Sequence, residues 1–163
     1  DPLRKDTQVG PLARKDLVTE LDRQVKESVK KGAKLVTGGK AIEGSGFYYE
    51  PTVLTNVKKG MPAYNEELFG PAASVIVVED ADEAVKVAND TRFGLGSSIW
   101  TNNIKKAEEM AGRIEAGAVF INDFVKSDPR MPFGGIKKSG YGRELGEYGI
   151  KEFVNIKTIM IRE

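Results

Sequence analysis

Apolar residues recur at every fourth position from Leu17 to Val29, and most positions between them are polar or charged. This spacing places the apolar side chains in one stripe, so it predicts an amphipathic helix in the first part of the chain. Asp16 stands where its side chain can cap the first turn, and Gly32 stands where the helix is expected to end.

Two short segments rich in β-forming residues follow this helix, at 34–37 and 48–54. Glycine-containing turns border both segments, which is typical of strands. Pro51 lies inside the second segment and has no backbone N–H to donate, so the pattern favours an edge strand there.

Strand and helix patterns alternate in the middle of the chain. A nearly continuous apolar run predicts a buried strand at 73–79, and further strands are predicted at 96–101 and, again buried, at 117–122. The capping pattern of Asp80 and Glu83 predicts a short helix at 80–89, and helical spacing of apolar residues predicts another at 104–114. Strands that alternate with helices at this spacing are joined by right-handed crossovers and pair in parallel. The sequence therefore predicts an α/β fold with a mainly parallel, three-layer sheet.

A glycine-rich segment, SDPRMPFGGIKKSGYGRELG, occupies residues 127–146. Unlike a flexible linker, it carries apolar side chains such as Phe133 and Leu145, which need burial. Glycine permits tight turns and close approach of the backbone, so we expect a shaped loop folded around a ligand or a partner surface.

Two motifs in this order resemble the aldehyde dehydrogenase superfamily. The later one consists of Pro132-Phe133-Gly134-Gly135 and the segment Lys138-Ser139-Gly140-x-Gly142-Arg143-Glu144, and the earlier one is Glu66-Glu67-Leu68-Phe69-Gly70-Pro71. The resemblance implies that residues 1–150 form the later part of that family's catalytic domain.

The remaining residues, 151–163, are predicted to form a terminal strand. Apolar residues are frequent from Glu152 to Arg162, and an unpaired strand of this kind is unfavourable in water, so we expect it to pair with another chain. In the family this segment belongs to the oligomerisation region, which implies a homo-oligomer.

The resemblance assigns cofactor contacts to Glu67 and Phe69. The matching glutamate of the family binds the ribose of the nicotinamide nucleotide, and the matching phenylalanine packs near the nicotinamide. A carboxylate can accept from both hydroxyls of a vicinal diol, and an aromatic ring offers a flat apolar wall. From the residues alone, Glu67 could equally be an ordinary surface carboxylate.

Three residues are candidates for substrate binding: Ser127, Arg130 and Phe133. The segment 127–146 is most similar to the succinate-semialdehyde branch of the superfamily, where a serine at position 127 contacts the substrate carboxylate. Arg130 could add a bidentate contact, and Phe133 could shape the aldehyde pocket. The alternatives are a capping hydroxyl, a solvated charge and a core anchor, and lactaldehyde or another small aldehyde remains a competing substrate.

The sequence contains no cysteine and no histidine. A cysteine nucleophile, a Cys/His zinc site and an imidazole base are therefore absent from this chain. The resemblance implies oxidation of an aldehyde by a cysteine thiolate with NAD or NADP as hydride acceptor. Because the match begins after that cysteine, we expect no catalytic residue, no metal site and no activity from this chain alone. In the family, the adenine and the phosphates of the cofactor are bound by the dinucleotide domain, which this sequence lacks. We therefore do not expect this chain alone to bind NAD(P).

Charge argues against two classes of partner. The 25 Lys and Arg residues are interspersed with 24 Asp and Glu residues, which leaves a net charge of +1 and no basic stripe for nucleic acid. No apolar run is long enough to span a bilayer and no signal segment opens the sequence, so we expect no membrane association and a cytoplasmic location.

Two other functions stay open at this point. The chain could be a stand-alone binding or assembly module that joins a larger dehydrogenase through its loop and terminal strand. It could also be a noncatalytic sensor of nicotinamide nucleotides that uses Glu67 and Phe69.

Overall fold

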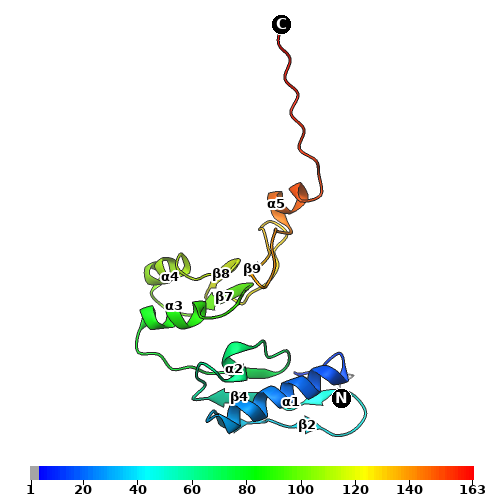
Figure 1. Cartoon of the computed structure of the whole chain (residues 1–163), viewed down its shortest axis with the longest axis vertical. Helices are drawn as coiled ribbons and strands as arrows, with labels where there is room; N and C mark the ends of the chain where they lie inside the picture. Colours follow the sequence, from blue (N-terminus) through cyan, green and yellow to red (C-terminus); the bar gives the residue numbers. More distant parts are fainter. Residues whose placement is uncertain (1–3) are drawn as a thin grey trace. The chain divides into compact units, whose positions relative to one another are not determined.

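A computed structural model describes residues 4–163. Its internal contacts fall into two compact units, Asp1–Val77 and Val78–Glu163 (Figure 1). The span 1–150, which the sequence analysis treats as one partial domain, thus contains a division after Val77, and residues 151–163 belong to the second unit.

The first unit is a helix packed on a small mixed sheet. Its elements are α1 (Lys15–Lys30), β1 (Lys34–Thr37), β2 (Ala41–Ile42), β3 (Tyr48–Tyr49), β4 (Thr52–Thr55), α2 (Pro62–Asn65) and β5 (Ala72–Ser74). The strand order is β1-β4-β5, with β1 antiparallel and β5 parallel to β4, while β2 and β3 form a separate antiparallel pair. Leu21 and Val25 of α1 and Leu54 of β4 are almost fully buried and form the centre of the core.

The predicted apolar stripe is present in α1, but its first turn differs from the expectation. The helix begins at Lys15, and its N-cap, Arg14, makes no side-chain capping bond. Asp16 lies inside the first turn, where its carboxylate pairs with the Arg14 guanidinium at 2.9 and 3.0 Å. Gly32 follows the helix with a φ of 106°, a conformation that glycine adopts without strain, which confirms the predicted end.

The predicted strand at 48–54 is divided in two. Pro51 separates β3 from β4, because a proline cannot continue the ladder. The second half is not an edge strand, since β4 lies between β1 and β5. The backbone N–H of Thr52 donates to the carbonyl of Pro71 at 2.8 Å, which ties the start of β4 to the entrance of β5.

The second unit contains a parallel crossover, as predicted. Its elements are α3 (Ala81–Asn89), β6 (Phe93–Gly94), β7 (Gly96–Ile99), α4 (Ile104–Ala111), β8 (Ala118–Ile121), β9 (Ile136–Lys137) and α5 (Gly146–Lys151). β7 and β8 pair in parallel from Gly96–Ala118 to Ile99–Ile121, with α4 in the connection, and β6 pairs antiparallel with β9. Figure 1 shows α4 beside these two parallel strands.

The α/β class is confirmed, whereas the three-layer sheet is not formed by residues 4–163. The strands belong to separate small sheets, and β5 ends at Ser74 although the apolar run continues. Val77 is 90% exposed, so the predicted double-sided burial is wrong for the end of that run. β5 pairs with β4 on one edge, and no strand of the described chain pairs with its other edge, so the sheet ends at β5.

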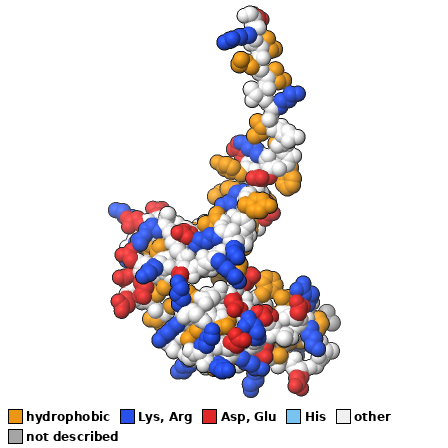
Figure 2. Space-filling model, viewed as in Figure 1, with side chains coloured by type: hydrophobic (Ala, Val, Ile, Leu, Met, Phe, Trp, Pro, Cys, Tyr) orange, Lys and Arg blue, Asp and Glu red, His pale blue; other side chains and the backbone are white. Residues whose placement is uncertain are grey.

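The predicted terminal strand is also absent from the structure. α5 ends at Lys151, and residues 152–163 form no strand (Figure 1). Their apolar side chains are exposed and line this segment in Figure 2, with Ile156 at 85%. A strand exists only where a second strand accepts its backbone hydrogen bonds, and residues 152–163 pair with no strand of the described chain.

Two glycines bring the start of β8 against the 127–146 loop. A Cβ atom added to Gly117 would lie 1.7 Å from the carbonyl oxygen of Gly134, so the two backbones touch. This close approach is the use of glycine that the sequence pattern predicts for the loop. Within residues 4–163, no helix is long and apolar enough to cross a membrane.

Candidate functional site

The first group of predicted site residues lies in the loop between α2 and β5. Leu68 packs on the buried core of the first unit, whereas the flanking Glu67 and Phe69 are exposed, Phe69 to 60%. Leu68 thus anchors the loop, and its two neighbours project outward. The structure leaves the Glu67 carboxylate accessible to a ligand.

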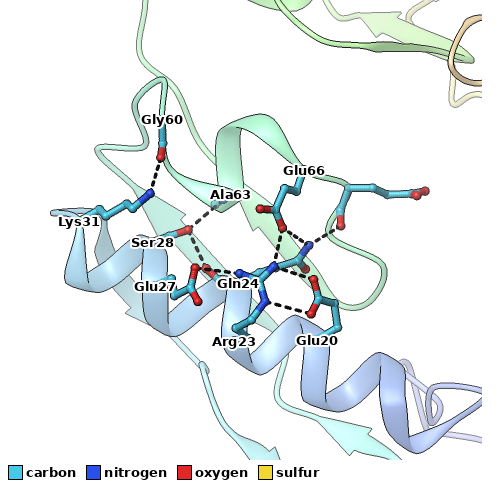
Figure 3. A network of polar contacts seen from close by, with 10 residues as sticks. Glu20, Arg23, Gln24, Glu27, Ser28, Lys31, Gly60, Ala63 and Glu66 are labelled. Atoms are coloured by element: carbon cyan, nitrogen blue, oxygen red, sulfur yellow. Dashed lines mark hydrogen bonds and ion pairs between the residues drawn. The ribbon is translucent and has the colours of Figure 1, made fainter.

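Helix α1 holds this loop through polar contacts (Figure 3). The side-chain amide of Gln24 donates to the backbone carbonyl of Glu67 at 2.9 Å and to the Glu66 carboxylate at 3.0 Å. The Arg23 guanidinium donates to the same Glu66 oxygen at 2.7 Å. Glu66, which the sequence analysis assigns no role, is therefore the carboxylate that fastens the loop to α1.

Arg23 is surrounded by three carboxylates. It also pairs with Glu20 at 2.6 Å and with Glu27 at 2.8 Å on its own helix. Hydrogen bonds to Glu20, Glu27 and Glu66 raise the pKa of the Arg23 guanidinium above its already high value. Its charge is therefore fixed, and these pairs hold the guanidinium beside the loop.

An apolar cavity of about 360 Å³ lies beside Phe69. It is formed by the segment before α1 and by the loop itself; the lining residues are Val9, Gly10, Pro11, Leu12, Ala13, Leu17, Leu68, Phe69, Gly70 and Pro71. A flat apolar group fits such walls, and an exposed carboxylate two positions from Phe69 suits hydroxyl groups. The geometry is compatible with the predicted cofactor contacts.

The second group of predicted residues belongs to the other unit and adjoins a cavity of about 590 Å³. One wall is β8, and the other is the start of the glycine-rich loop; the lining residues are Gly117, Ala118, Val119, Phe120, Ile121, Asp123, Lys126, Asp128, Arg130, Met131, Pro132 and Phe133. The structure brings Arg130 and Phe133 to one cavity. Ser127 is exposed and is not among the lining residues.

Arg130 already has an anionic partner. Its guanidinium forms a bidentate pair with the Asp128 carboxylate at 2.9 and 2.6 Å, and the Arg130 backbone N–H donates to the same carboxylate at 3.0 Å. These bonds hold the pKa of the Asp128 carboxyl far below its usual range. The Arg130 side chain is 86% exposed, so a substrate carboxylate could reach it only in competition with Asp128 and water.

A second internal ion pair borders the same cavity. Lys126 contacts Asp123 at 2.5 Å, and this hydrogen bond lowers the pKa of the Asp123 carboxyl. Both cations of the cavity wall are thus paired with adjacent carboxylates. The two cations and two carboxylates of the lining balance, and Phe133 belongs to its apolar part.

Asn122 has a structural role at the carboxyl end of β8. Its backbone is left-handed, with a φ of 54°, and its side chain accepts from the Thr101 N–H at 2.8 Å and donates to the Thr101 carbonyl at 2.9 Å. The amide thereby continues the pairing of β7 with β8 by one further step. Asparagine tolerates this backbone conformation better than most residues.

The remaining motif residues hold the loop together. Arg143 donates to the carbonyls of Gly135 and Gly142 at 3.0 and 2.7 Å. The Ser139 hydroxyl accepts from the Gly94 N–H at 2.9 Å. Arg143 therefore stabilises the fold of the loop through backbone carbonyls.

Sequence reasoning missed two buried polar residues of α1, Gln24 and Ser28. A signal for them exists, because they lie three and seven positions after the buried Leu21 and so fall on the same face of the helix. Polar residues at such positions indicate hydrogen-bonded contacts to a neighbouring element.

Comparison with known proteins identifies a family. Residues 1–159 match the aldehyde dehydrogenase family. The chain is 50% identical over 161 residues to a probable succinate-semialdehyde dehydrogenase [NADP(+)] of Synechocystis, and 48% identical over 159 residues to the succinate semialdehyde dehydrogenase [NAD(P)+] Sad of Escherichia coli. These matches cover 99% and 98% of this chain.

Solved structures agree with these relatives. The succinic semialdehyde dehydrogenase of Streptococcus pyogenes, determined with NADP+, superimposes with a TM-score of 0.95 at 41% identity over all of this chain. A lactaldehyde dehydrogenase superimposes with a TM-score of 0.94 at 32% identity over 98% of it. The chain spans about a third of these proteins, namely 36% and 34% of the curated relatives and 36% and 34% of the two structures.

Proposed function

Because the chain belongs to the aldehyde dehydrogenase family, we propose that it is the C-terminal part of an NAD(P)-dependent enzyme that oxidises an aldehyde to its carboxylic acid. Succinate semialdehyde is the favoured substrate. The observation that carries this choice is the identity of 48–50% to relatives named succinate-semialdehyde dehydrogenases, against 32% to a lactaldehyde dehydrogenase.

Glu67 and Phe69 are the proposed cofactor residues of this chain. The exposed carboxylate would accept hydrogen bonds from ribose hydroxyls, and the exposed ring beside the apolar cavity would contact the flat nicotinamide. When bound, NAD(P)+ supplies the hydride acceptor of the reaction. The two residues orient it and contribute no proton transfer.

Ser127, Arg130 and Phe133 are the proposed substrate residues. Phe133 contributes apolar surface to the cavity, and its backbone is held by two hydrogen bonds of 2.8 Å to Glu144. Arg130 would attract the distal carboxylate of succinate semialdehyde while sharing its guanidinium with Asp128. Ser127 could contact that carboxylate once the substrate approaches the exposed rim of the cavity.

The nucleophile must come from outside these residues, because the sequence has no cysteine. We therefore expect no aldehyde oxidation by the 163-residue chain alone. The test compares this chain with a full-length protein that contains it, using succinate semialdehyde with NAD+ and with NADP+. Aldehyde-dependent NAD(P)H formation by the full-length protein alone supports the proposal, and formation by the short chain contradicts it.

One observation favours a second role, assembly with another chain. The apolar side chains of residues 153–161 are exposed in the isolated chain, including Phe153, Ile156 and Ile159. We propose that this segment adds to a sheet edge of a second copy, since strand addition would satisfy its backbone groups and cover these side chains.

A further inference from the structure

Gln24 is a buried polar residue of α1, on the face that carries the buried Leu21 and Val25. It is 4% exposed and lies between Leu21 and Val25, which are both buried. Burial of an amide is unfavourable unless its hydrogen bonds are made, so a residue of this kind is kept for the groups it contacts.

Both contacts of the Gln24 amide nitrogen go to the loop that carries the proposed cofactor carboxylate. Its two N–H groups match two acceptors, the Glu67 backbone carbonyl at 2.9 Å and the Glu66 carboxylate at 3.0 Å (Figure 3). The contact to Glu67 uses the backbone only. The Glu67 side chain is thus held at its base and left exposed at its carboxylate.

Contacts on either side of α2 fix the loop relative to α1. Ser28 contacts the start of α2, because its hydroxyl accepts from the Ala63 N–H at 2.9 Å, whereas Gln24 contacts the residues that follow the end of α2. Arg23 clamps Glu66 from the solvent side at 2.7 Å. The same helix therefore sets the position of α2 through Ser28 and that of Glu67 through Gln24.

We infer that Gln24 is a positioning residue for Glu67, and that it tunes the affinity of the complete enzyme for its nicotinamide nucleotide. This inference rests on the proposed function, in which Glu67 binds the ribose. Gln24 contacts no ligand itself. It determines the direction from which the Glu67 carboxylate meets the ribose hydroxyls, and Arg23 supports it by fixing Glu66.

The test uses the full-length enzyme and the variant Gln24→Met, which keeps the length of the side chain and removes both donors. We expect the cofactor KM to rise about tenfold, while the aldehyde KM at saturating cofactor changes less than about twofold. Binding of NADH and NADPH, measured by fluorescence titration, should weaken in parallel with the cofactor KM.

Ser28→Ala is the matched control, since it removes a buried contact of α1 to α2 one turn further along the helix. It should lower Tm by an amount comparable to Gln24→Met and leave the cofactor KM within about twofold. An equal rise of the cofactor KM in both variants would overturn the inference, because it would mean that any loosening of α1 and α2 has this effect. If Gln24→Met fails to fold, Arg23→Met replaces it, since this side chain is partly exposed and should raise the cofactor KM in the same direction.

Glu67→Gln separates failure of the inference from failure of the proposed function. If Glu67→Gln leaves the cofactor KM unchanged, the ribose role of Glu67 is wrong and the inference is wrong with it. If Glu67→Gln raises the cofactor KM but Gln24→Met does not, only the inference is wrong. If Gln24 acts through Glu67, the effect of Gln24→Met should shrink to less than about threefold in the Glu67→Gln background, and an undiminished effect contradicts it.

Discussion

Phe133 and Glu144 exchange two backbone hydrogen bonds of 2.8 Å, which close the glycine-rich loop on itself. The backbone of Phe133 is therefore fixed independently of its side chain, which lines the cavity of the second unit. The two roles of this residue can be separated by mutation.

Phe133→Ala should widen the cavity without opening the loop. We expect a loss of about 2 kcal/mol in the free energy of unfolding, because the ring is half-buried, together with a higher aldehyde KM in the full-length enzyme. Thermal unfolding and steady-state kinetics measure the two effects. Tyr141→Ala, at a fully exposed aromatic of the same loop, is the control and should change neither quantity.

Arg130→Ala should reduce discrimination between charged and uncharged aldehydes. If Arg130 binds the distal carboxylate, kcat/KM for succinate semialdehyde should fall by about tenfold or more, while kcat/KM for butanal stays within about twofold. Asp128→Asn, which removes the competing carboxylate, should raise the preference for succinate semialdehyde. Equal losses on both aldehydes after Arg130→Ala would show that Arg130 does not recognise the carboxylate.

Asp128 should titrate well below an ordinary aspartate, whose pKa is 3.8. Its pKa is depressed by Arg130, so the pair contributes stability above the unfolded pKa and loses it as the pH falls below about 3.8. The contribution is therefore constant across neutral and weakly acidic pH. Carbon-13 NMR of the Asp128 carboxyl should give a midpoint below 3.8 that moves up toward this value in Arg130→Ala, and an unchanged midpoint would exclude the pairing.

Asn122→Ala should destabilise the second unit more than Asn122→Gly. Both substitutions remove the two hydrogen bonds to Thr101, but alanine must also adopt the left-handed backbone that glycine accepts readily. We expect a loss of about 3 kcal/mol for alanine and about 1 kcal/mol less for glycine. Urea unfolding of the two variants measures the difference, and equal losses would contradict a strained backbone at this position.

Charges in the terminal segment should prevent assembly. Ile156→Asp combined with Ile159→Lys keeps the net charge and places charged groups where the proposed interface needs apolar ones. Light scattering of the full-length enzyme should show a smaller particle for this double variant. Lys157→Glu, at an exposed polar position of the same segment, is the control and should leave the particle size unchanged.

The crossover β7–α4–β8 could be predicted from the sequence, since its helix and strand patterns are local and its two strands pair with each other. The strand expected from Glu152 to Arg162 could not, because a strand depends on pairing with another strand, and this segment pairs with none in the described chain. Val77 illustrates the same limit: its apolar neighbours indicate burial, but nothing in the described chain covers it.

The candidate site was predicted unevenly. Ser127, Arg130 and Phe133 are candidate substrate residues from the sequence; the structure puts Arg130 and Phe133 on one cavity, but Ser127 does not line it. The pairing of Arg130 with Asp128 could not be read from an apolar pattern, since it depends on the turn that places them side by side. The burial of Gln24 was not predicted, because a polar residue next to an apolar stripe is usually solvated.

The contact between Gly117 and Gly134 limits how this protein can diverge. A methyl group at position 117 would overlap the carbonyl oxygen of Gly134, so β8 or the loop would have to move to make room for it. Either movement displaces one wall of the cavity. In a library covering every single substitution of the full-length enzyme, almost no substitution of Gly117 should be found among the active variants, although no reacting group lies at this position. Glycine would then be retained at position 117 because it preserves the shape of the pocket, and not because it takes part in the chemistry.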